Sequence, residues 1–137
     1  MLNRRLFVQT GVAAAALVGD TMRFAPADGL ARASGLSLHT AIYDHRFAAG
    51  RQFAHNLQAQ GVSTRAIAGD VTSVWYEELH PLWKQRRVTI AGFTTYAPLF
   101  CLERLAWDHG MRVIHREQHQ PSARNEPSQL LYSWIIR

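Results

Sequence analysis

The spacing of its apolar segments constrains the fold of this 137-residue chain more than any other feature. Short runs typical of strands begin near residues 37, 63, 88 and 112, and each gap between them is long enough for one helix. This alternation predicts βαβ units, whose crossovers are right-handed and whose strands lie parallel in one sheet. The length suits one domain, which we expect to occupy residues 34–137.

Five strands are expected, over residues 37–43, 63–68, 87–93, 111–117 and 129–137. The connection before the last strand is too short for a crossover helix, so we expect that strand to pair antiparallel at an edge of the sheet. The predicted fold class is α/β. It is a small three-layer, Rossmann-like domain with a mostly parallel sheet of about five strands and an antiparallel C-terminal edge strand.

Three helices are expected between the strands. The first covers residues 47–60, and its apolar stripe is Gly50, Phe53, Ala54 and Leu57. Gly61 is placed to end it. The second follows Asp70 and is expected to break or kink at Pro81. The third runs over residues 97–109 and ends before Gly110.

Polar residues follow the strands where ligands bind in an open parallel sheet, beyond the carboxyl ends. The candidate ligand-binding residues are Asp44, His45, Arg46, Asp70, Thr72, Thr94, Thr95 and Tyr96, and the candidate catalytic residues are Asp44, Asp70 and His119. A guanidinium and a helix N-terminus favour an anionic group. Carboxylates recognise hydroxyl groups or accept protons.

Several of these residues also have a structural interpretation. Asp70 is placed to cap a helix, and the hydroxyls of Thr94 and Thr95 can satisfy the free N–H groups at a helix start. Asp44 and Arg46 have no evident duty in a cap or in the core. We therefore expect their replacement to weaken function more than folding.

Sequence motifs of the common α/β enzyme classes are absent. The chain has no GxGxxG after its first strand, no GxxxxGK[ST] and no GxSxG, which argues against dinucleotide binding, a P-loop NTPase and an α/β-hydrolase. His115 and His119 are four residues apart, but they fall on or after a strand, where that spacing does not align them. We expect no metal site and no cofactor.

Cys101 is the single cysteine of the chain, so no intramolecular disulfide can form. It lies in the apolar run Leu99–Leu102, which predicts that its thiol is buried and structural.

Charge and aromatic content bear on the partners. Residues 34–137 hold 11 Lys and Arg against 8 Asp and Glu, with no basic block, so nucleic acid is not an expected partner. The aromatic residues Trp75, Tyr76 and Trp83 exceed what one helix stripe can bury. They predict an exposed aromatic surface near Trp75 and Trp83 through which a partner protein binds.

Residues 1–33 have the three zones of an export signal. Arg4 and Arg5 stand in NRRLFVQ before a large apolar residue, and a weakly apolar stretch follows over residues 8–19. That stretch is shorter than the roughly 20 residues that span a bilayer. The small residues Ala31 and Ala33 flank Arg32 at its end.

This segment resembles a bacterial twin-arginine (Tat) signal peptide, and the resemblance extends over residues 1–33 only. It implies the Tat translocase as a partner, cleavage after Ala33, and a periplasmic or secreted protein that is not anchored in a membrane after cleavage. We therefore expect an exported periplasmic α/β accessory or binding protein that acts with a partner enzyme or a small polar ligand. The alternative is a small periplasmic enzyme that performs acid–base chemistry at the C-terminal edge of the sheet.

Overall fold

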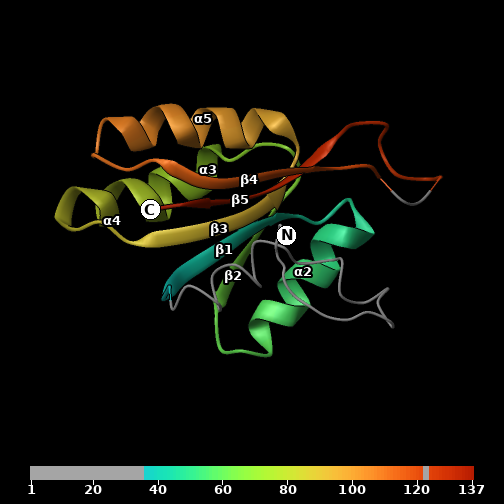
Figure 1. Ribbon diagram of the computed structural model, residues 1–137, viewed down its shortest axis with the longest axis horizontal. Helices are drawn as coiled ribbons and strands as arrows, with labels where there is room; N and C mark the ends of the chain where they lie inside the picture. Colours follow the sequence, from blue (N-terminus) through green and yellow to red (C-terminus); the bar gives the residue numbers. More distant parts are fainter. Residues whose placement is uncertain (1–35, 122–123) are drawn as a thin grey trace, which may run out of the picture.

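A computed structural model describes residues 36–121 and 124–137 of the chain (Figure 1). These residues form one five-stranded sheet of β1 (Leu38–Asp44), β2 (Ser63–Ile67), β3 (Thr89–Thr94), β4 (Val113–His119) and β5 (Leu131–Ile136). The strand order is β2-β1-β3-β5-β4. β1 pairs parallel with β2 and β3, whereas β5 pairs antiparallel with β3 and β4. The sheet is therefore mixed.

The prediction of a mostly parallel, three-layer, Rossmann-like domain with an antiparallel strand at its edge is wrong. Two of the four strand pairings are parallel and two are antiparallel. β5 does run antiparallel, but it lies inside the sheet between β3 and β4. β4 therefore pairs with β5 and not with β3, and β4 occupies the edge.

The burial of the two last strands gives the physical reason for this order. β5 (Leu131–Ile136) buries five of its six residues, so it requires a neighbouring strand on each side and cover on both faces. β4 (Val113–His119) buries none of its residues to that degree and carries polar side chains along its length. A strand of that composition tolerates the edge of a sheet.

The helix α2 (Ala48–Gln58) packs against one face of the sheet. Its predicted stripe of Gly50, Phe53, Ala54 and Leu57 is buried, which confirms the helical period in the sequence. The ring of Phe53 lies 5.5 Å from that of Phe93 on β3. Gly61 has a positive φ of 85° just after this helix, a conformation that glycine adopts readily.

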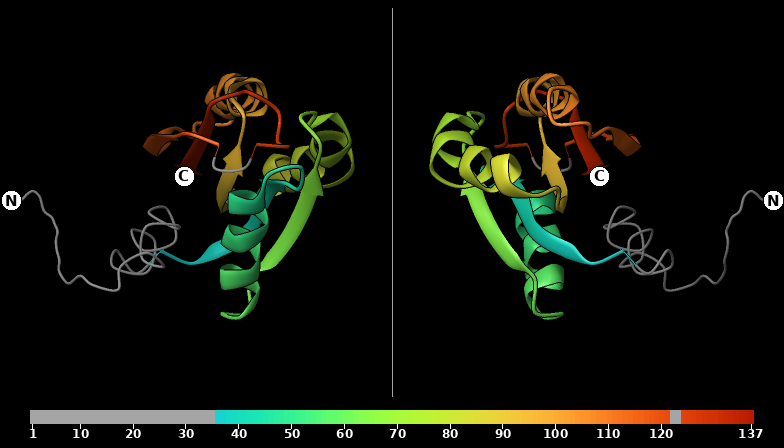
Figure 2. Two further views of the ribbon diagram at one scale, coloured as in Figure 1. Left: turned by 90° about the vertical axis from the view of Figure 1, so that its right-hand side faces the viewer. Right: turned by 90° about the vertical axis from the view of Figure 1, so that its left-hand side faces the viewer.

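The other face carries α3 (Thr72–Val74), the π-helical segment η2 (Trp75–Leu79), α4 (His80–Gln85) and α5 (Tyr96–Trp107). Figures 1 and 2 show α5 and α2 on opposite sides of the sheet. Trp75, Leu79 and Trp83 pack there with Leu99 and Leu102 of α5 in one buried cluster.

The helix predicted to break or kink at Pro81 changes its hydrogen bonding at that point. The N–H of His80 donates to the carbonyl of Trp75, five residues back, so π-helical geometry precedes the proline. Pro81 then lies in the first turn of α4, where its missing N–H leaves no hydrogen bond unmade.

Candidate functional site

The carboxyl ends of β1, β2 and β3 meet at one edge of the sheet, as expected for parallel neighbours. Asp44 lies beside Ile67 of β2, and Tyr43 lies beside Phe93 of β3. The residues that follow these strands therefore share one region of the molecule. We call Asp44, Arg46, Thr94 and Trp134 the strand-end rim.

Asp44 and Arg46 form an ion pair within this rim. The Arg46 guanidinium donates from Nε to Asp44 Oδ1 at 2.9 Å and from Nη2 to Oδ2 at 2.7 Å, and the Arg46 backbone N–H donates to Oδ1 at 3.1 Å. The carboxylate is fully buried, while the Arg46 side chain is 32% exposed. These hydrogen bonds raise the pKa of Arg46. Asp44 thus has a structural duty that the sequence did not predict.

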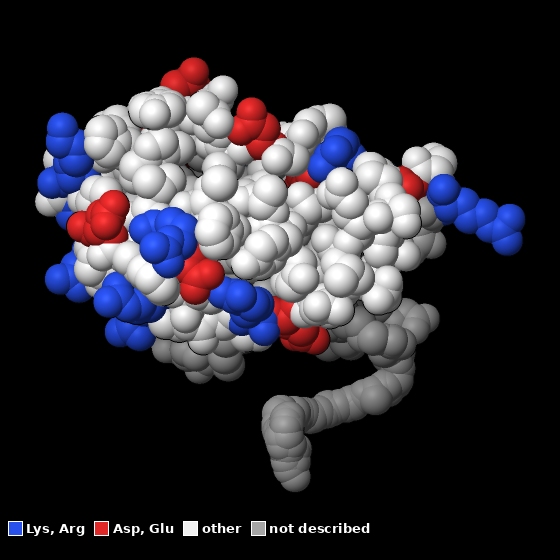
Figure 3. Space-filling view, turned by 90° about the horizontal axis from the view of Figure 1, so that it is seen from above, with Lys and Arg blue, Asp and Glu red and all other residues white. Residues whose placement is uncertain are grey.

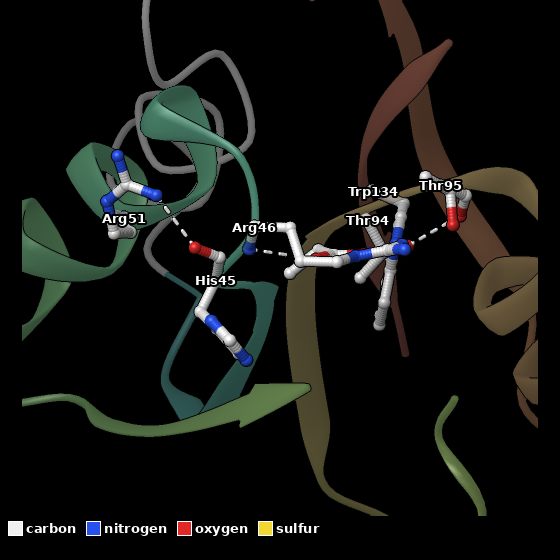
Figure 4. Close-up of polar contacts among 7 residues, drawn as sticks. His45, Arg46, Arg51, Thr94, Thr95 and Trp134 are labelled. Atoms are coloured by element: carbon white, nitrogen blue, oxygen red, sulfur yellow. Dashed lines mark hydrogen bonds and ion pairs between the residues drawn. The ribbon is translucent and has the colours of Figure 1, made fainter. Parts of the chain in front are cut away.

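The guanidinium of Arg46 also lies against Gly69 in the loop after β2. A Cβ placed on Gly69 would come within 2.7 Å of Arg46 Nη2, and Gly69 has a φ of 85°. His45 is tied into the same turn through its backbone. Its N–H donates to the Ile67 carbonyl at 2.9 Å and its carbonyl accepts from Arg51 at 2.7 Å (Figure 4). The side chain of His45 is exposed.

Thr94 and Trp134 complete the rim. The indole Nε1 of Trp134 donates to Thr94 Oγ1 at 3.0 Å, and that hydroxyl donates to the Thr95 carbonyl at 2.8 Å (Figure 4). All three residues are buried. Thr95 precedes α5, but neither hydroxyl caps the helix. The predicted capping role of these threonines is therefore not found, and the Thr94 hydroxyl and the Thr95 carbonyl are hydrogen-bonded within the rim.

Asp70 is engaged with its neighbour Thr72. Asp70 Oδ1 accepts from the Thr72 N–H at 2.9 Å and from the Thr72 hydroxyl at 2.6 Å. These hydrogen bonds, the one from the side chain first, lower the pKa of the exposed Asp70 carboxyl. These hydrogen bonds close a turn just before α3, but the N-cap residue of α3 is Val71, which has no side-chain cap hydrogen bond. The predicted cap by Asp70 is therefore not found.

His119 lies at the end of β4 and on the α2 side of the sheet. Its ring stacks on Phe93 at 5.0 Å, and its Nε2 is 2.9 Å from Ser133 Oγ. Phe93 belongs to the buried cluster beneath α2, whereas Trp134 belongs to the cluster beneath α5. Burial lowers the pKa of His119. Among the described residues, no contact joins His119 to Asp44 or Asp70, so the three candidate catalytic residues do not form one constellation.

A cavity of about 400 Å³ opens between the loop after β2, η2 and α5. We call it the η2–α5 groove. Its walls are Gly69, Asp70, Val71, Thr72, Trp75, Tyr76, Ala97, Pro98, Cys101 and Leu105. Asp70 is the one charged residue among them, and most of the others are apolar. Two predicted site residues, Asp70 and Thr72, therefore lie at this groove.

Cys101 lines the groove and is exposed, so the prediction of a buried thiol is wrong. The apolar run that contains it wraps around the helix. Leu99 and Leu102 are three residues apart and face the sheet, whereas Phe100 and Cys101 point outward. The three-residue spacing of the leucines was the signal that could have distinguished the two sides.

Exposed aromatic side chains lie in the groove and on α5. Tyr76 lines the groove, whereas Tyr96 packs on Phe100 and on Tyr132 of β5, on another side of α5. Tyr76 is 66% exposed, Tyr96 48%, Phe100 46% and Trp107 45%. Figure 3 shows the α5 side of the molecule with a broad uncharged surface at its centre. Trp75 and Trp83 are themselves buried in the core. The exposed aromatic residue beside Trp75 in the groove is thus its neighbour Tyr76.

No family model, curated protein or solved structure matches this chain. No helix within residues 36–121 or 124–137 is long and apolar enough to cross a membrane. Arg4, Arg5, Ala31 and Ala33 lie outside the described residues. We therefore infer function from the geometry of the groove and the rim.

Proposed function

We propose that this chain is an exported accessory protein that binds a partner protein in the η2–α5 groove. The supporting observation is that the open, mostly apolar groove is lined by Tyr76, whose side chain is 66% exposed. Exposed aromatic surface is costly in water and is typical of binding sites, where aromatic residues supply much of the affinity.

The lining of the groove indicates what such a partner presents. Apolar walls from Val71, Pro98 and Leu105 suit an apolar side chain, and the Asp70 carboxylate at the groove suits an adjacent Lys or Arg. We therefore propose that the partner inserts an apolar side chain flanked by a basic residue.

The strand-end rim offers less to a ligand. The Asp44 carboxylate is fully buried and receives three hydrogen bonds from Arg46, and the Thr94 hydroxyl is buried between Trp134 and Thr95. Polar atoms that are buried and already hydrogen-bonded are held in place by the fold. They favour a scaffold role for the rim over direct ligand recognition.

Site-specific photo-crosslinking in the native host tests the groove. A photoreactive phenylalanine analogue at Tyr76 should give a discrete adduct with one protein, whereas the same analogue at the exposed Gln52 of α2 should not. Ala97→Asp places a charge in the apolar groove and should abolish the Tyr76 adduct. Because Ala97 is exposed in the first turn of α5, the substitution should change the free energy of unfolding by less than about 0.5 kcal/mol. Adducts of equal yield from Tyr76 and Gln52 would contradict the proposal.

We propose export through the Tat translocase, on the resemblance of residues 1–33 to a twin-arginine signal. Replacing Arg4 and Arg5 together by Lys should leave the precursor in the cytoplasm. Mass spectrometry of the exported protein should find Ser34 as its first residue. Unchanged export of the double variant would contradict the route without affecting the groove proposal.

The alternative function is a small periplasmic enzyme, and one observation favours it. His119 Nε2 lies 2.9 Å from Ser133 Oγ, a separation at which an imidazole can accept a hydroxyl proton, and its lowered pKa favours the neutral base. Ser133 is fully buried, however, so the hydroxyl is not open to a substrate. An acyl adduct on Ser133 that is lost in His119→Gln would favour this alternative over the binding protein.

A further inference from the structure

The opposite end of the sheet holds a second cavity, of about 470 Å³, which we call the arginine cavity. It is lined by Arg87, Val88, Thr89, Arg112, Ile114 and Arg137. Arg87 precedes β3, Arg112 precedes β4 and Arg137 follows β5, so three strands each contribute one guanidinium. This cavity is separate from the η2–α5 groove, and the inference drawn from it does not depend on the proposed function.

Two of these arginines are direct neighbours across the sheet. The backbone N–H of Arg112 donates to the carbonyl of Arg137 at 2.9 Å, and the N–H of Arg137 donates to that of Arg112 at the same distance. Residues paired in this way have their Cα atoms about 5.5 Å apart and their side chains on the same face. Like charges in that position destabilise a strand pair unless something neutralises them.

The three guanidiniums have few partners within the protein. Arg87 Nη1 lies 3.4 Å from the Gly110 carbonyl and Arg112 Nη1 donates to the Met111 carbonyl at 2.9 Å. Each guanidinium has five N–H donors, so most of them are left over. Arg46, Arg65 and Arg116 each form an ion pair with a carboxylate. Among the residues that the structure describes, Arg87, Arg112 and Arg137 form none.

The surroundings strengthen the positive charge. Lys84 and Arg86 end α4 at the same end of the sheet, and both are exposed. Figure 3 shows several basic residues toward the left-hand end of the molecule, with acidic residues among them. Asp108 follows α5 nearby and forms no ion pair with these arginines in the described part of the chain.

We propose that the arginine cavity binds a phosphate group. Planar guanidiniums donate two parallel hydrogen bonds to one phosphate, and three of them from separate strands surround a single anion without rearrangement of the sheet. The Thr89 hydroxyl adds a neutral donor. Val88 and Ile114 supply apolar walls that strengthen the interaction by limiting solvent. The bound group would also relieve the repulsion between Arg112 and Arg137.

Isothermal titration of the purified full chain with inorganic pyrophosphate tests this site. The double variant Arg87→Gln/Arg112→Gln removes two lining charges. Lys84→Gln/Arg86→Gln is the matched control, since it removes two charges from the same end that do not line the cavity. We expect the first variant to weaken binding at least about tenfold, because charge-assisted hydrogen bonds to phosphate are stronger than neutral ones and two guanidiniums are lost. The control should weaken it less than about threefold, as diffuse charge does.

Equal weakening in the two double variants, or no saturable binding to the natural sequence, would overturn the proposal. The variant Arg87→Lys/Arg112→Lys controls for a folding defect. It keeps both positive charges but loses the planar guanidinium groups that donate two parallel hydrogen bonds. It should bind pyrophosphate with intermediate affinity, and its unfolding midpoint should equal that of the natural chain. Vesicles of phosphatidylglycerol then identify the source of the phosphate. Vesicle binding that pyrophosphate displaces indicates a lipid headgroup, and pyrophosphate binding without vesicle binding indicates a free phosphate compound.

Discussion

The strand-end rim and the η2–α5 groove lie at the same edge of the sheet, yet they differ in how their side chains are satisfied. In the rim, Asp44 is fully buried and bound by Arg46, and the indole of Trp134 is bound by Thr94. In the groove, the Tyr76 side chain is exposed beside an open apolar cavity, and the Cys101 thiol is accessible. Polar residues at a strand end are therefore weak evidence of a binding site when they bind one another. Exposed apolar surface beside them is stronger evidence of a binding site.

The largest expected loss of stability comes from breaking the Arg46–Asp44 ion pair of the rim, and it should exceed the loss from breaking a surface ion pair. Arg46→Ala leaves the buried Asp44 carboxylate with one backbone hydrogen bond, and should lower the free energy of unfolding by about 3 kcal/mol. The control is Arg65→Ala, which breaks an ion pair with Glu78 in which the Arg65 side chain is 48% exposed. It should cost less than about 1 kcal/mol in urea unfolding. Similar losses in the two variants would remove the distinction on which the scaffold role of the rim depends.

A smaller loss is expected from Thr94→Val, which keeps the shape of the side chain and removes the acceptor of the Trp134 indole. An unsatisfied buried donor costs about 1–3 kcal/mol, and we expect about 1.5 kcal/mol from denaturant unfolding. Thr94→Ser restores the hydroxyl and should recover most of the loss. If Val is as stable as Thr here, the hydrogen bond does not hold the rim together.

The β4 histidines should give a weaker effect that depends on pH. Burial lowers the pKa of both His115 and His119, and the charge of His119 lowers that of His115 further. As the pH falls through the ordinary histidine pKa of 6.5, these two imidazoles bind protons more readily in the unfolded chain than in the folded chain. The free energy of unfolding should therefore decrease as the pH falls through this range. Burial raises the pKa of Glu117, which acts in the opposite direction closer to its ordinary 4.5.

Thermal unfolding at pH 7.5 and pH 5.5 checks this sign. The midpoint temperature of the natural chain should fall further from pH 7.5 to pH 5.5 than that of the double variant His115→Gln/His119→Gln. A double variant with the same pH dependence as the natural chain would show that neither imidazole is responsible.

The sequence predicted the elements of this fold better than their arrangement. The stripe of α2 and the glycines after α2 and α5 follow from local spacing, which the sequence contains in full. The position of β5 inside the sheet does not follow from local spacing. It depends on how the burial of β5 compares with that of β4, which only the complete fold determines.

The same limit applies to the site. Parallel neighbours made the meeting of Asp44, Asp70 and Thr94 at one edge predictable, whereas the partners of these side chains depend on angles that spacing does not specify. His119 reaches that end of the sheet, but its side chain stacks on Phe93 on the α2 face, and β5 separates its strand from β3. The exposed thiol of Cys101 was missed because an apolar run on a helix was treated as a single surface.

The central claim, that the η2–α5 groove is occupied by a partner protein in the native host, is tested most directly by the reactivity of Cys101. As the single cysteine, it can be labelled with a membrane-permeable maleimide in intact cells and in the purified protein without further engineering. The variant Cys101→Ser/Ala59→Cys places the thiol at the exposed end of α2 and serves as the control. We predict that Cys101 reacts rapidly when purified and at least about tenfold more slowly in cells, while the control thiol reacts equally fast in both. Equal rates for Cys101 in the two settings would contradict the claim.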